Sequence, residues 1–140
     1  MGFNLEFMKY EDITRRIIAA AMKVHSSLGN GFQEVIYLRA LEIEFAYEQL
    51  SFKREMEMPI YYRNEHIGTR RVDFFVEELI MVELKALIKL EDVHLAQAMN
   101  YLEAYNMEIG LLINFGARSL EFHRLTNKKY SPVNKNPNIQ

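Results

Sequence analysis

The chain has 140 residues, of which 49% are hydrophobic and 26% are charged, and it contains no cysteine. This length fits one ordinary domain with a sizeable core, and the lack of cysteine excludes disulfides and thiolate metal sites and favours a reducing cytoplasm. The formal net charge of −2 argues against the broad basic footprint of a DNA-packaging protein, although it leaves room for a small local one.

Two helices are predicted in the first third of the chain. Apolar residues recur at helical spacing from Glu11 to Leu28, with Asp12 as the candidate N-cap and Gly29 as the end signal. A second helix is predicted from about Gln33 to Gln49. Glu34 lies in its first turn, where the helix dipole favours an anion, so periodicity alone gives this residue an ordinary structural explanation.

Three β-rich runs follow the second helix. The first covers residues 51–63, and Pro59 within it predicts an edge strand. The next two cover residues 70–76 and 79–86, and only Glu77-Glu78 separates them. Two short β-rich runs joined by two residues predict a hairpin.

Three ionisable residues lie within these last two, otherwise apolar, strands. Because strand side chains alternate between faces, Asp73 lies on one predicted face of its strand, as Glu83 and Lys85 do on theirs. Isolated charges in such a setting are costly unless they are paired or bind a metal. The opposite face is the expected core side, formed by Val72, Phe74, Val76, Ile80, Val82 and Leu84.

Beyond Lys85 the spacing of apolar residues changes from strand-like to helical. A helix is predicted from Glu91 or Asp92 to about Asn106, with Gln97 on a stripe beside its apolar side. The continuous apolar run 109–115 predicts a buried strand, and residues 120–125 predict a final one. The apolar side of the helix is expected to comprise Val93, Leu95, Ala96, Met99, Leu102 and Tyr105.

The order helix, helix, three strands, helix, two strands predicts an α/β fold. A hairpin followed by a crossover helix gives a mixed sheet flanked by helices, and the helix after Lys85 is long enough for a right-handed crossover to a parallel strand. Neither repeats nor a linker divide the sequence. We expect a single domain over residues 1–140, with a core at about 11–126 and a polar C-terminal tail at 127–140.

The two carboxylates and the lysine suit metal-assisted chemistry on phosphate. Oxygen ligands on neighbouring strands match a hard cation such as Mg²⁺ or Mn²⁺. A lysine two residues after the second carboxylate can orient water and stabilise charge on a phosphodiester undergoing hydrolysis. The E-x-K pattern alone is weak evidence because it occurs by chance in many strands, and a structural ion-pair cluster on a half-exposed face is the competing interpretation.

Asp73, followed after about ten residues by Glu83-Leu84-Lys85, resembles the signature of the PD-(D/E)xK nuclease superfamily. Gly31-Phe32-Gln33-Glu34-Val35-Ile36-Tyr37 is similar to the G-x-x-E-x-x-Y motif that names the GxxExxY family within it. The resemblance extends over about residues 13–125 and departs from the signature at Val72, where proline is usual. It implies a restriction-endonuclease-like fold, an α-β-β-β-α-β core with a mixed sheet flanked by helices.

The resemblance also implies roles for individual residues. Asp73 and Glu83 become metal ligands for Mg²⁺ or Mn²⁺, with the Leu84 carbonyl as a further ligand. Lys85 becomes the group that orients the attacking water. Glu34 reaches the metal shell directly or through water.

Gln97 matches a position that supports the site in the superfamily. The implied activity is metal-dependent hydrolysis of nucleic acid, DNA more than RNA, and a small nuclease that cuts both strands commonly works as a homodimer. The alternative is a non-catalytic module that keeps the nuclease fold and binds nucleic acid or protein. The small size and negative net charge favour that alternative, whereas the resemblance favours the nuclease.

Overall fold

Helices and strands follow one another in the predicted order. The computed structural model describes residues 9–132, so residues 133–140 of the predicted tail lie outside the described residues. The elements are α2 (Glu11–Leu28), α3 (Glu34–Tyr47), β1 (Phe52–Tyr62), β2 (Glu65–Val76), β3 (Ile80–Lys85), α4 (Asp92–Ala104), β4 (Ile109–Asn114) and β5 (Glu121–Thr126).

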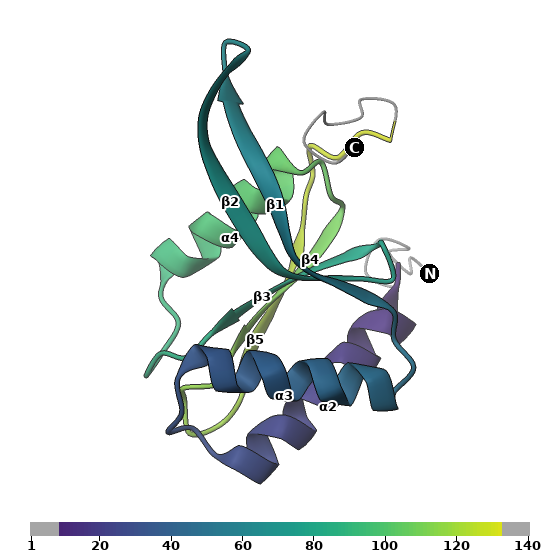
Figure 1. The fold of residues 1–140 in the computed structure, drawn as a ribbon, viewed down its shortest axis with the longest axis vertical. Helices are drawn as coiled ribbons and strands as arrows, with labels where there is room; N and C mark the ends of the chain where they lie inside the picture. Colours follow the sequence, from purple (N-terminus) through teal and green to yellow (C-terminus); the bar gives the residue numbers. More distant parts are fainter. Residues whose placement is uncertain (1–8, 133–140) are drawn as a thin grey trace, which may run out of the picture.

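The five strands form one mixed sheet in the order β1-β2-β3-β4-β5, with α2 and α3 on one face and α4 on the other (Figure 1). β3 and β4 are parallel, and the other neighbouring pairs are antiparallel. The predicted crossover is confirmed, because α4 links the parallel strands. β1 is an edge strand, as Pro59 predicted. The prediction of an α/β fold with a mixed sheet flanked by helices is therefore confirmed.

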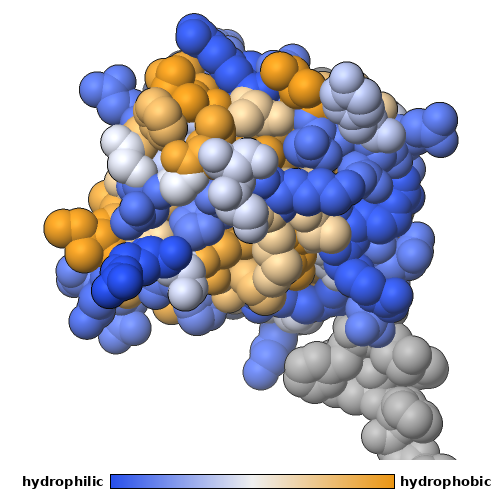
Figure 2. All heavy atoms as spheres, turned by 90° about the horizontal axis from the view of Figure 1, so that it is seen from below, coloured by the Kyte–Doolittle hydropathy of each residue, from blue (hydrophilic) through white to orange (hydrophobic). Residues whose placement is uncertain are grey.

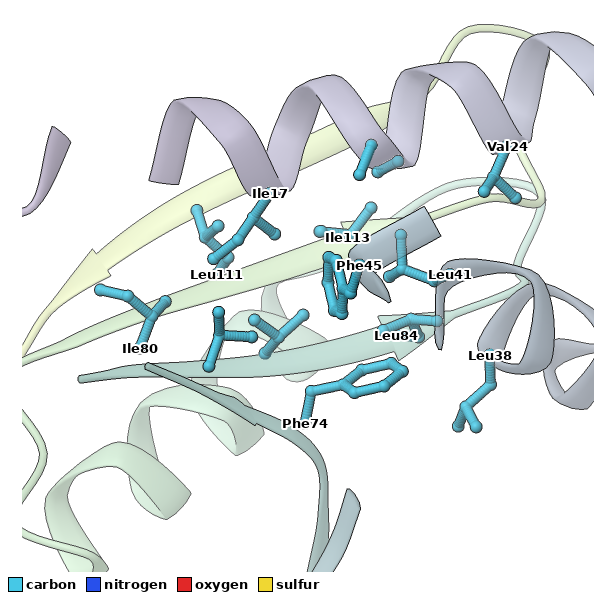
Figure 3. Close-up of a cluster of buried hydrophobic side chains, with 14 of the residues drawn as sticks. Ile17, Val24, Leu38, Leu41, Phe45, Phe74, Ile80, Leu84, Leu111 and Ile113 are labelled. Atoms are coloured by element: carbon cyan, nitrogen blue, oxygen red, sulfur yellow. The ribbon is translucent and has the colours of Figure 1, made fainter. Parts of the chain in front are cut away.

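Both faces of the sheet are buried, which explains why β3 and β4 are almost continuously apolar. The face under α2 and α3 holds the larger core, and α4 covers a second core on the other face. Figure 3 shows members of the larger core: Ile17, Val24, Leu38, Leu41, Phe45, Phe74, Ile80, Leu84, Leu111 and Ile113. The second core includes Met58, Val72, Phe75, Met81, Ala98, Leu102, Tyr105 and Leu112.

The expectation of one core side was wrong at Val72, which packs in the second core whereas Phe74 packs in the larger one. Strict alternation would place both on the same face. The alternation of side chains between the two faces of β2 is interrupted at Asp73. Opposite Asp73 in β1, the backbone of Glu55 is left-handed, with φ 51°. Beyond this irregularity, the apolar side chains of β1 and β2 pack against α4 instead of against α2 and α3.

Beyond this reversal β1 and β2 continue without β3 as a two-stranded ribbon that projects from the sheet (Figure 1). We call this ribbon, residues 56–72, the arm. Its strands stay paired up to Tyr62 and Glu65. At its base the Tyr105 hydroxyl donates a hydrogen bond of 3.0 Å to the Met56 carbonyl, so the end of α4 anchors the arm.

Two details of the helices differ from prediction. Asp12 is not the N-cap of α2, because the helix already begins at Glu11 and Tyr10 occupies the N-cap position. Asp12 instead lies in the first turn, where its negative charge interacts favourably with the positive end of the helix dipole. On α4, Val93 and Ala96 are exposed, because the side facing the sheet is centred on Ala98 and Leu102.

The outer surface of α2 and α3 carries apolar side chains interspersed with polar ones (Figure 2). On α3 the inner side holds Tyr37, Leu41 and Phe45, whereas Ile43 and Tyr47 face outward. Among the helices of residues 9–132, none combines the length and apolarity needed to cross a membrane.

Candidate functional site

Asp73 and Glu83 lie where β2 separates from β3. The last regular pair of this ladder is Phe74 with Val82, so Asp73 and Glu83 occupy the next positions along the two strands. At these positions the backbone amides of one strand bond to carboxylate side chains of the other strand instead of to its backbone carbonyls. The Asp73 amide donates to Glu83 Oε1 at 3.1 Å, and the Leu84 amide donates to Asp73 Oδ2 at 2.7 Å. These reciprocal bonds fix the two carboxylates next to each other.

Each carboxylate keeps one oxygen free for another partner. Within residues 9–132 no hydrogen bond reaches Asp73 Oδ1 or Glu83 Oε2. Lys85 forms no ion pair with either acid, although it is near enough for its charge to affect both. A tightly paired Lys85 would characterise a structural ion-pair cluster, and this arrangement lacks that pairing.

Burial and like charge make this pair of acids hard to ionise. Glu83 is only 7% exposed. Its burial and the neighbouring Asp73 raise the pKa of Glu83 to about 8. Burial also raises the pKa of Asp73, although the Leu84 amide and the positive charges of Lys85 and Arg54 oppose that rise. A cation at the free oxygens would relieve both effects.

Glu34 faces the same site from α3. The residue as a whole is exposed, yet partial loss of water around its carboxyl, and then the charge of Asp73, raise the pKa of Glu34, while Lys85 lowers it. Glu34, Asp73, Glu83 and Lys85 therefore share one electrostatic environment although they come from three elements.

The donor set suits a hard divalent cation held by few protein ligands. Among the described side chains, no group of three or more His, Cys, Asp or Glu is arranged to hold a metal ion. Mg²⁺ usually keeps several waters and is bound by one or two carboxylates together with substrate phosphates. Two adjacent carboxylates with free oxygens, Asp73 and Glu83, fit that mode, whereas a cage made entirely of protein groups does not fit.

The loop before α3 is held by Tyr37. Its buried hydroxyl donates to the Gly29 carbonyl at 2.6 Å and accepts from the Phe32 amide at 3.1 Å. The Tyr37 ring stacks on Phe115, with centroids 4.8 Å apart. Tyr37 therefore ties the end of α2 to the start of α3, where Glu34 is the first residue.

The segment after Lys85 is held by Asn114, a buried residue that sequence reasoning missed. Its side-chain oxygen accepts from the Leu87 amide at 2.8 Å, and its amide nitrogen donates to the Leu87 carbonyl at 2.9 Å and to Glu121 at 2.7 Å. Asn114 also lies beside Lys85 in the parallel register. The signal in the sequence was a single amide within the apolar run 109–115.

Arg54 and Glu55 border the site from β1 and were also missed. Arg54 bonds to Glu42 on α3 at 2.7 Å and to Glu55 at 3.0 Å, and its guanidinium lies over the Phe74 ring. This cation faces Asp73 from the strand opposite. Nothing in the local pattern of β1 distinguishes Arg54 from an ordinary surface arginine.

Gln97 is the predicted site residue that the structure does not bring into contact with the others. It is exposed on α4 and forms no hydrogen bond with the carboxylates or with Lys85. Nearby on the same helix, Tyr101 carries the Arg70 guanidinium over its ring at 5.5 Å, which links α4 to the arm.

Comparisons with known proteins agree with the fold. A family model described as the PD-(D/E)XK nuclease superfamily matches residues 11–125. The crystal structure of SSO0001 is similar with a TM-score of 0.54 and 18% sequence identity, over 86% of this chain and 60% of that one. This chain thus spans about 60% of the length of that protein. No curated protein matches the chain.

Proposed function

Because the chain belongs to the PD-(D/E)XK nuclease superfamily, we propose that it is a metal-dependent nuclease domain. It hydrolyses phosphodiester bonds, with DNA as the preferred substrate over RNA. The observation that carries this proposal is the fork, the point where β2 separates from β3: there Asp73 and Glu83 each accept one backbone amide and, within residues 9–132, keep one oxygen free beside a Lys85 that forms no ion pair.

Each residue of the site has a distinct role in this proposal. Asp73 and Glu83 bind Mg²⁺ or Mn²⁺ through their free oxygens, with the Leu84 carbonyl as a further ligand and Glu34 acting directly or through water. When bound, the cation supplies Lewis acidity and neutralises charge on the phosphate. Lys85 orients the attacking water and stabilises the charge that develops on the phosphoryl oxygens.

We further propose that the chain is a GxxExxY-type member of the superfamily. The motif residues Glu34 and Tyr37 support this assignment, since Tyr37 bonds on both sides of the loop that leads to Glu34. We also propose that Gln97, on the helix after the E-x-K strand, supports the site, as its position in the superfamily pattern implies.

Cleavage of defined substrates tests the proposal. We expect the purified protein to cut members of a panel of single- and double-stranded DNA and RNA with Mg²⁺ or Mn²⁺, and EDTA to abolish cutting. Lys85→Ala should lower the rate about 100-fold or more. Lys23→Ala is the matched control, because Lys23 lies on α2 outside the site, where it pairs with Glu48 at the end of α3. Equal rates for wild type and Lys85→Ala would contradict the assigned chemistry.

Calorimetry separates the nuclease from a non-catalytic module with the same fold. We expect Mn²⁺ to bind the wild type and to bind Asp73→Asn at least tenfold more weakly. The negative net charge of the chain is the observation that favours the alternative. A protein that binds nucleic acid without binding Mn²⁺ and without cutting any substrate would establish that alternative. Sedimentation of the same samples tests whether the domain works as a homodimer.

A further inference from the structure

The arm is supported at its base and free at its tip. The base packs on α4 through Met58 and Val72, and the Tyr105 hydroxyl bonds to the Met56 carbonyl. Isolated two-stranded ribbons are marginal in water, so these contacts with α4 hold the arm in place. The tip, residues 61–67, lies beyond them, and all of its residues are exposed.

The tip gathers aromatic and apolar side chains that have no protein cover. Tyr61 is 48% exposed, Tyr62 is 65% exposed and Ile67 is 64% exposed. The Tyr61 and His66 rings lie 5.9 Å apart across the ribbon. Large aromatic groups held in water on a projecting hairpin mark a surface that contacts a partner.

The charges of the arm favour an anionic partner. At the base, Arg71 pairs with Glu57 at 2.8 Å, so these two charges cancel. Arg63 at the tip and Arg70 on β2 form no ion pair within the described part of the chain. With Arg71 and Glu57 cancelling, these two arginines against the single acid Glu65 leave the arm net positive in a chain that is net negative.

The arm is also continuous with the candidate site. β2 runs from His66 at the tip to Asp73 at the fork. The seven steps from His66 to Asp73 span about 23 Å of strand, a length that covers several nucleotides of a nucleic-acid strand. One strand therefore connects the aromatic tip with the residues proposed to act on phosphate.

We infer that the arm is a nucleic-acid contact in which Tyr61, Tyr62 and His66 at its tip stack on unpaired bases, while Arg63 at the tip and Arg70 nearer the base meet phosphates. Aromatic side chains accept any base by stacking, and neighbouring cations follow the backbone, which is how single strands are held without sequence preference. This inference rests on the proposed function, and it adds a contact several nucleotides from the bond that is cut.

Binding without cleavage tests the inference. The probe is a fluorescein-labelled single-stranded DNA of about twenty mixed-sequence nucleotides, and its anisotropy is measured in EDTA so that the strand stays intact. We expect the double variant Tyr61→Ala with Tyr62→Ala to bind at least about tenfold more weakly than the wild type. Tyr47→Ala is the matched control, because Tyr47 is 78% exposed on α3, away from the arm, and should not change affinity.

A second variant controls for the possibility that the alanine substitutions disrupt the hairpin itself. Tyr61→Phe with Tyr62→Phe keeps the rings and should bind as the wild type does, since stacking does not need the hydroxyls. Arg63→Ala should reduce the salt dependence of binding by about one counterion. A blunt duplex of the same sequence should lose much less affinity in the alanine variant than the single strand does.

Several results would overturn the inference. These are equal affinity of the alanine variant and the wild type, an equal loss for duplex and single strand, a loss of dimers in the alanine variant, or no binding by the wild type. Cleavage by the wild type with unchanged binding by the variant would overturn this inference alone. Binding through the arm without any Mg²⁺-dependent cleavage would instead overturn the proposed function.

Discussion

Among the residues of the site, Glu83 carries the largest electrostatic cost. Its carboxyl is buried beside Asp73, so its pKa rises to about 8 from an ordinary value of 4.5. The folded protein therefore binds this proton more tightly than the unfolded chain does. The stabilisation is complete below pH 4.5 and is lost as pH rises toward 8, because ionisation then places a charge in the protein interior.

We expect this loss to be visible in unfolding experiments without metal. As pH rises from about 5 to 8 in EDTA, the free energy of unfolding of the wild type should fall relative to that of Glu83→Gln, which has no proton to lose. Urea denaturation at several pH values measures the difference. Glu65→Gln, on the exposed turn of the arm, should follow the wild type. If the free energies of unfolding of wild type and Glu83→Gln changed in parallel with pH, the pKa of Glu83 would not be raised by folding.

Tyr37 offers a second test, because one hydroxyl closes the loop before α3. Tyr37→Phe keeps the ring stacked on Phe115 but leaves the Phe32 amide and the Gly29 carbonyl without this partner. We expect a loss of about 1–3 kcal/mol in unfolding free energy. Tyr47→Phe, on the exposed side of α3, should cost almost nothing. Equal stability of the two variants would mean that water replaces the hydroxyl without cost.

The connections between elements depend on one close approach of two backbones. A Cβ added at Gly116 would lie 2.4 Å from both the amide nitrogen and the carbonyl oxygen of Leu87. This contact lies where Asn114 holds the segment after Lys85. By contrast, nothing lies within 4 Å of a Cβ added at Gly31, the motif glycine.

We therefore expect Gly116→Ala to destabilise the fold by about 3 kcal/mol or more, because backbone atoms cannot move aside as a side chain can. Gly31→Ala should change stability by less than about 1 kcal/mol. Thermal unfolding by circular dichroism compares the two variants directly. If Gly31→Ala destabilised the fold more than Gly116→Ala does, the motif glycine would have a role that the open space around it does not explain.

Local patterns were sufficient to predict most elements. Helical spacing and Gly29 gave α2 its bounds of Glu11–Leu28, and Glu77-Glu78 formed the predicted turn, with left-handed backbone at both residues. The reversal at Asp73 could not be predicted, because it depends on the left-handed backbone of Glu55 in the neighbouring strand and on the cover that α4 offers the arm. The same holds for Arg54, whose partner Glu42 lies on another element, and for the raised pKa of Glu83, which requires burial.

Across the whole molecule, order should decrease from the centre of the sheet to the tip of the arm. β4 lies between β3 and β5, and all six of its residues are buried. The tip has neither a third strand nor a covering helix. In native-state hydrogen exchange, the β4 amides should therefore exchange only through global unfolding, whereas the tip amides should exchange much faster through local opening. Equal protection of the two regions would indicate that the arm is stabilised by contacts other than those with α4.

The fork has a consequence for judging which relatives of this chain are enzymes. Asp73 and Glu83 each take the place of a missing rung between β2 and β3, so the sheet itself gains from keeping both acids. A relative without nuclease activity would therefore lose folding stability by replacing either one and would tend to retain both. The Lys85 side chain makes no hydrogen bond or ion pair within residues 9–132, so it makes no such contribution. Under the proposed function, the presence of this lysine, rather than of the two acids, is expected to distinguish active nucleases from inactive relatives.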